Sequence, residues 1–342
     1  MGDAAPSLDG AGAGQGRSIN FLQLARRLFR EKPLGAIGGV ITLALLFTGL
    51  FADVLAPYGM NDTDKLNFLA PPSAQYWLGT DHLGRDMVSR IIYGARISVV
   101  VGLTSSAITV AIAVLIGVLS GYIGGPFDLM VQRVVDAVMA LPGLVLLLVI
   151  ISMIGPGMWS VIVTLGVLGG ISSSRIIRSA VIAIKENSYV AAAQAIGCRR
   201  STMFMRHLLP NIMAPIIILF SLNIPGVILS EASLSFLGFG IPAPQPSWGA
   251  MLGGKARPYM MSAPWMVLWP GMALAVVVFG TNIFGDALRD LLDPRLRGGS
   301  GRYGLTGRGK ELARSLRGKL ADNGTAGSVG AAAGKAAANK EV

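Results

Sequence analysis

The chain has 342 residues, of which 52% are hydrophobic and 14% are charged, and its formal net charge is +11. A soluble domain carries about 25% charged residues, so an ordinary soluble globule is excluded. The single cysteine, Cys198, excludes an internal disulfide, and with only two histidines it argues against a cysteine- or histidine-based metal site. The composition predicts an integral membrane protein.

Six apolar stretches reach or approach the roughly 20 residues that a helix needs to cross a bilayer. In chain order they are Leu34–Ala56, Ser98–Ile123, Ala137–Ile154, Met158–Ser174, Ile212–Leu234 and Trp265–Phe284. The first is longer than the core of a typical signal peptide, and no small-residue cleavage site follows it. We therefore predict an all-α integral membrane fold with six transmembrane helices.

The distribution of lysine and arginine predicts that both termini lie in the cytoplasm. With that orientation, only six of the 29 basic residues fall on the outer side, namely Lys65, Arg85, Arg90, Arg96, Lys255 and Arg257. A basic cytoplasmic face is ordinary beside membrane spans, so the net charge gives little support to a nucleic-acid partner.

This topology divides the chain into four parts. A cytoplasmic N-terminal tail (1–33) precedes the first helix and an external segment (34–97). Five helices and a cytoplasmic loop (175–211) make up the main transmembrane domain (98–297). The basic C-terminal tail (298–342) is rich in Gly, Ala and Lys and is expected to be disordered.

Small residues and prolines recur within the spans. Small residues stand four apart in three places, at Gly35 and Gly39, Gly117 and Gly121, and Gly166 and Gly170. Such pairs favour close helix packing, either inside this bundle or against a second membrane subunit. Three prolines, Pro142, Pro215 and Pro225, are expected to kink or locally open their helices.

Glu231 is the one acid well inside an apolar run. A charge at mid-bilayer is costly, so such a residue usually faces a cavity or a partner, which makes Glu231 a candidate pathway or gate residue. Its place near the predicted outer end of its span also allows it simply to reach water. Asp136, Arg175 and Asp286 stand at predicted inner boundaries and are expected to anchor helix ends.

No catalytic motif is evident in the chain. Two stretches imitate a phosphate-binding P-loop, one ending at Lys255 and one at Lys310, but Ala256 and Glu311 stand where Ser or Thr is needed to hold magnesium. Neither the nucleophile elbow of hydrolases nor a His-Glu-x-x-His helix occurs. We expect no catalytic residues, no metal site and no cofactor in this chain.

The longest inner loop, 175–211, contains two short helices on this reading. Tyr189, Val190, Ala191, Ala192 and Ala193 belong to a run of strong helix formers that stops at Gly197. A more basic helix, Ser201–Leu209, is predicted to end before Pro210. A short helix held between two spans is a plausible lever, because pushing it moves both spans.

The spacing from Ala191 through Gly197 to Leu209, Pro210 and Asn211 resembles the EAA loop of bacterial ABC-importer permeases. In that family the loop supplies a coupling helix that docks on an ATPase subunit. The resemblance implies that role for Tyr189, Val190, Ala191, Ala192, Ala193, Gly197, Leu209 and Pro210. Ala191 stands where the family usually has glutamate, so a polar contact from that position is not implied.

A second match is more specific. Trp77 to Asp81, Gly84 to Asp86, and Gly94 to Arg96 resemble the external segment of the dipeptide/oligopeptide and nickel permease group. Glu231 to Gly240, Pro246 to Gly249, and Gly285 to Asp290 with Asp293-Pro294 resemble later signatures of that group, and the pattern is that of the C-type subunit.

Four external charges, Asp81, Arg85, Asp86 and Arg90, are expected to form a salt-bridged patch on the surface just outside the membrane. By resemblance this patch is a landing surface for a substrate-binding protein. The alternative is a clamp that holds the external segment on the bundle.

The resemblance implies a type I permease of the bacterial cytoplasmic membrane that imports di- or oligopeptides. Its partners would be a homologous B-type permease, two cytoplasmic ATPases that bind ATP and Mg²⁺, an external binding protein and the lipid bilayer. Nickel or another small solute is the alternative substrate. An ion-coupled transporter or channel is the rival function, and it would need intramembrane acids or broken helices at a midplane site, preferably in matching halves. Glu231 is the only candidate for such a site, and no internal repeat is evident.

Overall fold

The computed structural model describes residues 21–199 and 202–292, without the side chains of residues 21–25, 194, 207 and 255–257. The predictions made for the first twenty residues and for the C-terminal tail lie outside the described residues. The described part is built from helices, and its only strand-like pairing is an isolated bridge between Thr80 and Asp86.

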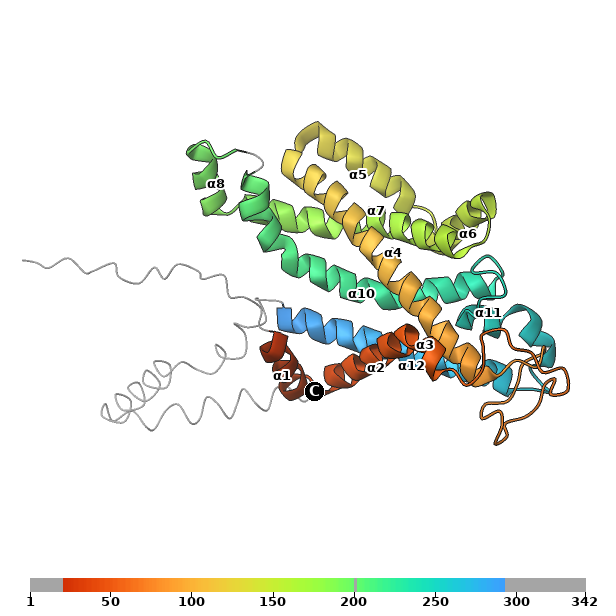
Figure 1. The fold of residues 1–342 in the computed structure, drawn as a ribbon. Helices are drawn as coiled ribbons and strands as arrows, with labels where there is room; N and C mark the ends of the chain where they lie inside the picture. Colours follow the sequence, from red (N-terminus) through yellow and green to blue (C-terminus); the bar gives the residue numbers. More distant parts are fainter. Residues whose placement is uncertain (1–20, 200–201, 293–342) are drawn as a thin grey trace, which may run out of the picture. The chain divides into compact units, whose positions relative to one another are not determined.

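Helices follow one another along the chain with one long interruption (Figure 1). They are α1 (Phe21–Glu31), α2 (Pro33–Leu50), α3 (Ala52–Leu55), α4 (Met87–Ile123), α5 (Gly125–Met139), α6 (Gly143–Ile154), α7 (Met158–Lys185), α8 (Ser188–Ala195), the π-helix η1 (Met203–Leu208), α10 (Leu209–Phe236), α11 (Trp248–Leu252), the 3₁₀-helix η2 (Gly254–Tyr259) and α12 (Trp265–Leu292). The interruption, residues 56–86, is named the external segment below.

Five of these helices, α2, α4, α7, α10 and α12, are long and apolar enough to cross a membrane, and a sixth span results if the bent pair α5 and α6 is counted as one. The predicted all-α membrane fold is therefore confirmed. The helices extend past the predicted spans: α4 begins at Met87 rather than Ser98, and α7 continues to Lys185.

The third span is broken at Pro142, one of the prolines predicted to kink its helix. Where the sequence predicts a single span over Ala137–Ile154, α5 and α6 meet at an angle of 87°. The break falls at Leu141 and Pro142, where proline lacks a backbone N–H and disfavours the helical conformation of the residue before it. The bent pair also begins earlier than predicted, at Gly125. The prediction missed most of α5 because this helix carries polar residues, which lower its hydropathy. By contrast, α10 remains helical through Pro215 and Pro225.

The small-residue pairs pack inside the bundle. A methyl group placed on Gly35 would lie 2.2 Å from the Ala287 Cβ of α12, and one on Gly117 would lie 2.6 Å from the Ser174 carbonyl of α7. Gly166 meets Ile108 of α4 in the same way. The glycines thus bring α2 against α12 and α4 against α7, and the alternative that they form an interface to a second subunit is not needed to explain them.

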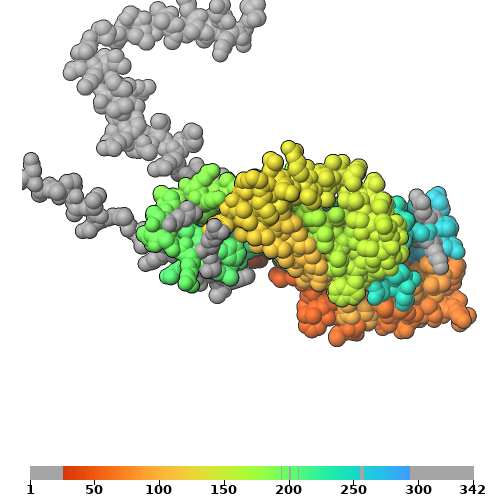
Figure 2. Space-filling model, turned by 90° about the horizontal axis from the view of Figure 1, so that it is seen from above, coloured from red at the N-terminus to blue at the C-terminus, as the bar shows by residue number. Residues whose placement is uncertain are grey.

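The long helices separate two ends of the bundle. At one end α8 and η1 lie beside the start of α10, and at the other the external segment lies near α11 and the end of α10 (Figure 1). Figure 2 shows α5 and α6 covering one face between these ends. The buried apolar core is divided accordingly, with one cluster under α8 and another under the external segment and α11.

Candidate functional site

The predicted coupling helix exists as α8, and one of its faces is fixed to the bundle. Val190 is 1% exposed and Ala193 is 9% exposed. These two residues stand three apart, so they share a helix face. They belong to a buried cluster with Val181 of α7, Leu208 of η1 and Ile212 near the start of α10. The buried side of α8 therefore packs against the ends of two spanning helices.

A glycine ends α8 in the way the sequence predicts. The Cys198 N–H donates a hydrogen bond of 3.1 Å to the Ala193 carbonyl, which is the closing bond of a Schellman motif. Gly197 has φ of +76°, in the left-handed region that favours glycine. A methyl group there would meet no atom within 4 Å, so a side chain at this position costs backbone energy and causes no clash.

The rest of the surface of α8 and the residue after it are exposed and mostly apolar. Ile196 is 85% exposed and Tyr189 is 43% exposed, and Ala191 and Ala192 are exposed beside them. We name these four residues the coupling face. The Tyr189 hydroxyl accepts a hydrogen bond of 3.3 Å from the Asn211 amide, which ties the face to α10. Such a flat apolar strip suits packing into a groove of another protein.

The second helix of the loop differs from its prediction. Instead of an α-helix that ends before Pro210, the π-helix η1 runs directly into α10, and Pro210 stands in the first turn of α10. The Leu209 N–H donates to the Phe204 carbonyl, so the helix is continuous and Pro210 stands where π-helical hydrogen bonding gives way to α-helical. Leu208 is buried, whereas Leu209 is partly exposed and Pro210 is exposed. Ser201 lies outside the described residues.

The charged external residues do not form a surface patch. Asp81, Arg85, Asp86 and Arg90 are between 3% and 8% exposed. The sequence prediction of their exposure is therefore wrong. The chain folds back on itself at this point, with the isolated bridge between Thr80 and Asp86, so that the external segment covers its own charges.

Asp81 is the centre of this charged cluster. Its Oδ1 accepts hydrogen bonds from the Leu83 and Arg85 N–H groups at 2.8 Å and 3.0 Å. Its Oδ2 lies 2.7 Å from Nε and Nη2 of Arg85 and 3.4 Å from the Arg90 Nε. Burial raises the pKa of Asp81, but the hydrogen bonds and charge of Arg85 more than offset it, so the pKa lies below its ordinary value.

Asp86 and Arg90 fix the start of α4. The Asp86 carboxylate accepts hydrogen bonds of 2.8 Å from the N–H and the hydroxyl of Ser89, which makes Asp86 the N-cap of the helix. These contacts support the clamp alternative, in which the charges hold the external segment on the bundle. A contact of these residues with a binding protein stays a prediction.

Two tryptophans add contacts at this end of the bundle, and the sequence analysis assigned a role to neither. The Trp265 indole donates to the Thr80 carbonyl at 3.0 Å, and the Trp248 indole donates to the Ile91 carbonyl at 3.1 Å. A methyl group on Gly94 would lie 2.5 Å from Trp248, so this glycine makes room for the ring. The available signals were the Pro246 to Gly249 motif around Trp248 and the place of Trp265 at the start of an apolar run.

Glu231 is buried and does not reach water. It is 1% exposed, and its Oε1 accepts hydrogen bonds of 2.7 Å from the hydroxyls of Ser235 and Ser247. The prediction that it could reach water at the end of its span is thus wrong, because α10 ends against α11 and the loop that carries Ser247. Its role as a pathway or gate residue stays a prediction.

A further ion pair joins α5 to α7. Arg178 contacts the Asp128 carboxylate, and the Ser120 hydroxyl hydrogen-bonds to the same group. Asp136 pairs with Arg175 between the same two helices, although both were predicted only as helix-end anchors. Pairing was not predictable because 39 and 50 residues separate the partners. The described residues contain no group of three or more His, Cys, Asp or Glu that could hold a metal ion.

Comparison with known proteins decides the family. Residues 113–298 match the family described as binding-protein-dependent transport system inner membrane component. The chain belongs to this family. Residues 20–72 also match the N-terminal transmembrane domain of oligopeptide transport permease C, in agreement with the predicted C-type pattern.

Similar proteins extend over most of the chain. The oligopeptide transport system permease protein OppC of Bacillus subtilis is 35% identical over 281 residues, which cover 82% of this chain and 92% of that protein. The dipeptide transport system permease protein DppC of Alkalihalophilus pseudofirmus is 36% identical over 273 residues, covering 80% and 90%. The glutathione transport system permease protein GsiD of Escherichia coli O157:H7 is 36% identical over 275 residues, covering 80% and 90%.

These matches confirm the predicted class of function. The chain is a multi-pass permease subunit of an ABC importer of the bacterial inner membrane. As a component of a binding-protein-dependent system, it works together with other proteins.

Proposed function

We propose that this chain is the C-type member of a pair of membrane subunits in an ATP-driven importer of di- or oligopeptides. The names of its relatives support this substrate class, since an oligopeptide, a dipeptide and glutathione are all short peptides. In this scheme a homologous B-type permease completes the pathway, and an external binding protein delivers the peptide. Two cytoplasmic ATPases bind ATP and Mg²⁺ and hydrolyse the nucleotide, and both tails of this chain lie in the cytoplasm.

The observation that carries the proposal is the two-sided construction of α8. Val190 and Ala193 hold one side to α7 and α10, while Ala191, Ala192 and Ile196 are exposed and would pack into a groove of the ATPase. A motor can shift the permease only if its contact with α8 differs between the ATP-bound and ATP-free states. Closure of the ATPases would then move the ends of α7 and α10 through the buried contacts of Val190 and Ala193.

The native cysteine allows this contact to be tested directly. Cys198 is the only cysteine of the chain, is partly exposed, and follows the glycine that ends α8. A thiol-reactive photo-crosslinker on Cys198 should link the chain to an ATPase subunit in the assembled transporter, detected by mass spectrometry. Cys198→Ser is the matched control and should give no product.

Variants of α8 separate docking from anchoring. Ile196→Ala removes an exposed side chain and should lower the crosslinking yield several-fold without loss of folded protein. Val190→Ala removes buried methyl groups, at a cost of about 1–3 kcal/mol, so it should reduce transport while ATPases still bind. Gly197→Leu should also uncouple transport at equal membrane abundance, because the left-handed backbone that ends α8 is lost.

Reconstitution discriminates this proposal from the ion-coupled rival. Vesicles with the complete transporter should take up a labelled dipeptide only when ATP is supplied to the ATPases. Uptake by vesicles that hold this chain alone would contradict the proposal. Uptake of Ni²⁺ in place of peptide by the complete transporter would contradict the substrate class only.

A further inference from the structure

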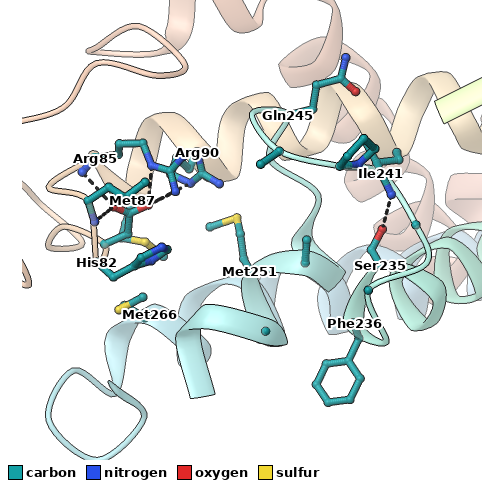
Figure 3. A pocket seen from close by; sticks show the side chains of 18 of the residues that line it. His82, Arg85, Met87, Arg90, Ser235, Phe236, Ile241, Gln245, Met251 and Met266 are labelled. Atoms are coloured by element: carbon teal, nitrogen blue, oxygen red, sulfur yellow. Dashed lines mark hydrogen bonds and ion pairs between the residues drawn. The ribbon is translucent and has the colours of Figure 1, made fainter. Parts of the chain in front are cut away.

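A cavity of about 440 Å³ lies at the end of the bundle opposite α8. Its walls come from segments far apart in the chain: the end of the external segment, the start of α4, the loop after α10, α11 and the start of α12. Figure 3 shows Arg85, Arg90 and His82 on one side and Ser235, Phe236 and Ile241 on the other. This volume lies within the range of small-molecule sites.

The charges that line the cavity do not balance. Arg85 and Arg90 face it, but Asp81 is the only carboxylate among the lining residues. The other two buried carboxylates nearby, Asp86 and Glu231, do not line it, and both are engaged elsewhere: Asp86 caps α4 and Glu231 accepts two serine hydroxyls. With Asp81 paired to Arg85, the cavity wall carries a surplus positive charge.

Arg90 holds this surplus charge and has an unsatisfied donor. Its side chain is 9% exposed, and within the described residues its guanidinium pairs with the Asp81 Oδ2, 3.4 Å from Nε. Its Nη1 is buried and has no hydrogen-bond partner in the part of the chain that the structure describes. A buried guanidinium with an unpaired donor is costly, and a carboxylate is the group that satisfies it best, through two parallel hydrogen bonds.

The rest of the cavity is suited to variable apolar groups. Met87, Met251 and Met266 contribute to its walls, with Phe236 and Ile241 opposite. Methionine is flexible and polarizable, so it adapts to side chains of different shape. One fixed cation beside an adaptable apolar surface selects for a carboxylate and not for a particular side chain.

We propose that this cavity is a binding site for the carboxylate end of a small solute, with Arg90 as the anchoring residue. The inference rests on the proposed function, since under it the solute is a short peptide and the bound group is its C-terminal carboxylate. Because Arg85 pairs with Asp81, the Asp81 carboxylate does not fully neutralise the charge of Arg90. The methionines then accept whichever side chains the peptide carries.

The direct test compares the dipeptide Ala-Phe with its C-terminal amide. Both probes have the same side chains and differ only in the carboxylate. Their affinities would be measured for the full-length chain, purified with its associated subunits and held in lipid nanodiscs. Because a charged hydrogen bond changes affinity by at least about tenfold, the acid should bind at least about tenfold more tightly than the amide. Equal affinities would overturn the proposal.

Variants locate the effect at Arg90. Arg90→Gln should bring the ratio of acid to amide affinity close to one, and Arg90→Lys should retain part of it. Arg96→Gln is the matched control, because Arg96 pairs with the exposed Asp53 and does not line this cavity. A ratio unchanged by Arg90→Gln would overturn the proposal. If Arg90→Gln does not fold, a second variant replaces it. Ala243→Trp, at an exposed position that lines the cavity, should obstruct the cavity and weaken the binding of both probes. Unchanged binding of both probes to Ala243→Trp would also overturn the proposal.

Two further measurements identify the source of the carboxylate. If Arg90→Gln weakens capture of the peptide-free binding protein and leaves the acid-to-amide ratio intact, the carboxylate belongs to that protein and the proposal is overturned. If the complete transporter does not take up peptides but the ratio holds and depends on Arg90, the carboxylate site stands and only the proposed substrate class fails.

Discussion

Asp81 accepts contacts from two backbone N–H groups and two arginines, although its side chain is only 5% exposed. A buried ion pair contributes little net stability when it is complete, because desolvation offsets the attraction. Loss of one partner is a different matter, since it leaves the remaining charges buried and uncompensated. At Asp81 two arginines would be left in that state.

Asp81→Asn should therefore lower the free energy of unfolding by about 3–5 kcal/mol, seen as a clear drop in melting temperature in detergent. Asp53→Asn is the matched control, because Asp53 pairs with Arg96 at a largely exposed site and should cost about 0–1 kcal/mol. Equal effects of the two variants would show that the Asp81 cluster does not hold the external segment.

The pH dependence of this effect has a defined sign. The pKa of Asp81 is lowered in the folded chain, so its contribution is present above the unfolded value of about 3.9 and is lost as pH falls through the lower folded pKa. The difference in melting temperature between the original chain and Asp81→Asn should thus stay constant from about pH 7 to pH 5. A difference that shrinks across that range would contradict the lowered pKa.

Helices α4 and α7 pack more closely than side chains would allow. Gly117 and Gly121 of α4 face the backbone of α7, where a methyl group would lie 2.6 Å from the Ser174 carbonyl and 3.0 Å from the Arg178 carbonyl. Backbone atoms cannot move aside as a flexible side chain can. The absence of a side chain at these two positions therefore sets the distance between the helices.

Gly117→Ala should destabilise the chain by about 1–3 kcal/mol through overpacking, which would appear as a lower melting temperature in detergent. Gly226→Ala tests the same substitution inside α10, where a methyl group meets nothing within 4 Å. Alanine is about 1 kcal/mol more favourable than glycine in a helix, so this control should be neutral or stabilising. Destabilisation of the same size in both would rule out the packing explanation.

Across the whole molecule, α10 connects the two ends where function is proposed. It begins beside α8 and ends near the cavity with Glu231 and Ser235, and its 28 residues correspond to about 42 Å. A single continuous helix transmits displacement well, which gives α8 a physical route to the opposite end of the bundle. The arrangement also requires that these ends lie on opposite sides of the membrane.

Labelling of Cys198 tests that orientation. A membrane-impermeant maleimide should modify Cys198 in inside-out vesicles and leave it unmodified in intact spheroplasts, as followed by a mass shift of the chain. A cysteine placed at the exposed Ser73 of the external segment, in a Cys198→Ser background, should show the reverse pattern. Labelling of Cys198 from outside would contradict both the cytoplasmic position of α8 and the direction of the coupling.

The sequence alone was sufficient to predict features that depend on neighbouring residues. The apolar spans, the alanine-rich α8 and its stop at Gly197 follow from local hydropathy, helix propensity and the left-handed backbone that glycine permits. The close-packing glycines were also visible, because a spacing of four places them on one helix face.

Only the tertiary structure decided which distant groups meet. Burial of Asp81 and Arg90 depends on how residues 56–86 fold over the bundle. One of the two partners of Glu231 is Ser247, which lies 16 residues away on the far side of a loop. The pairing of Asp128 with Arg178 depends likewise on packing of α5 against α7. Hydropathy describes the affinity of a segment for lipid. Whether a charged side chain is buried, and with which group it pairs, depends on contacts that only the folded chain creates.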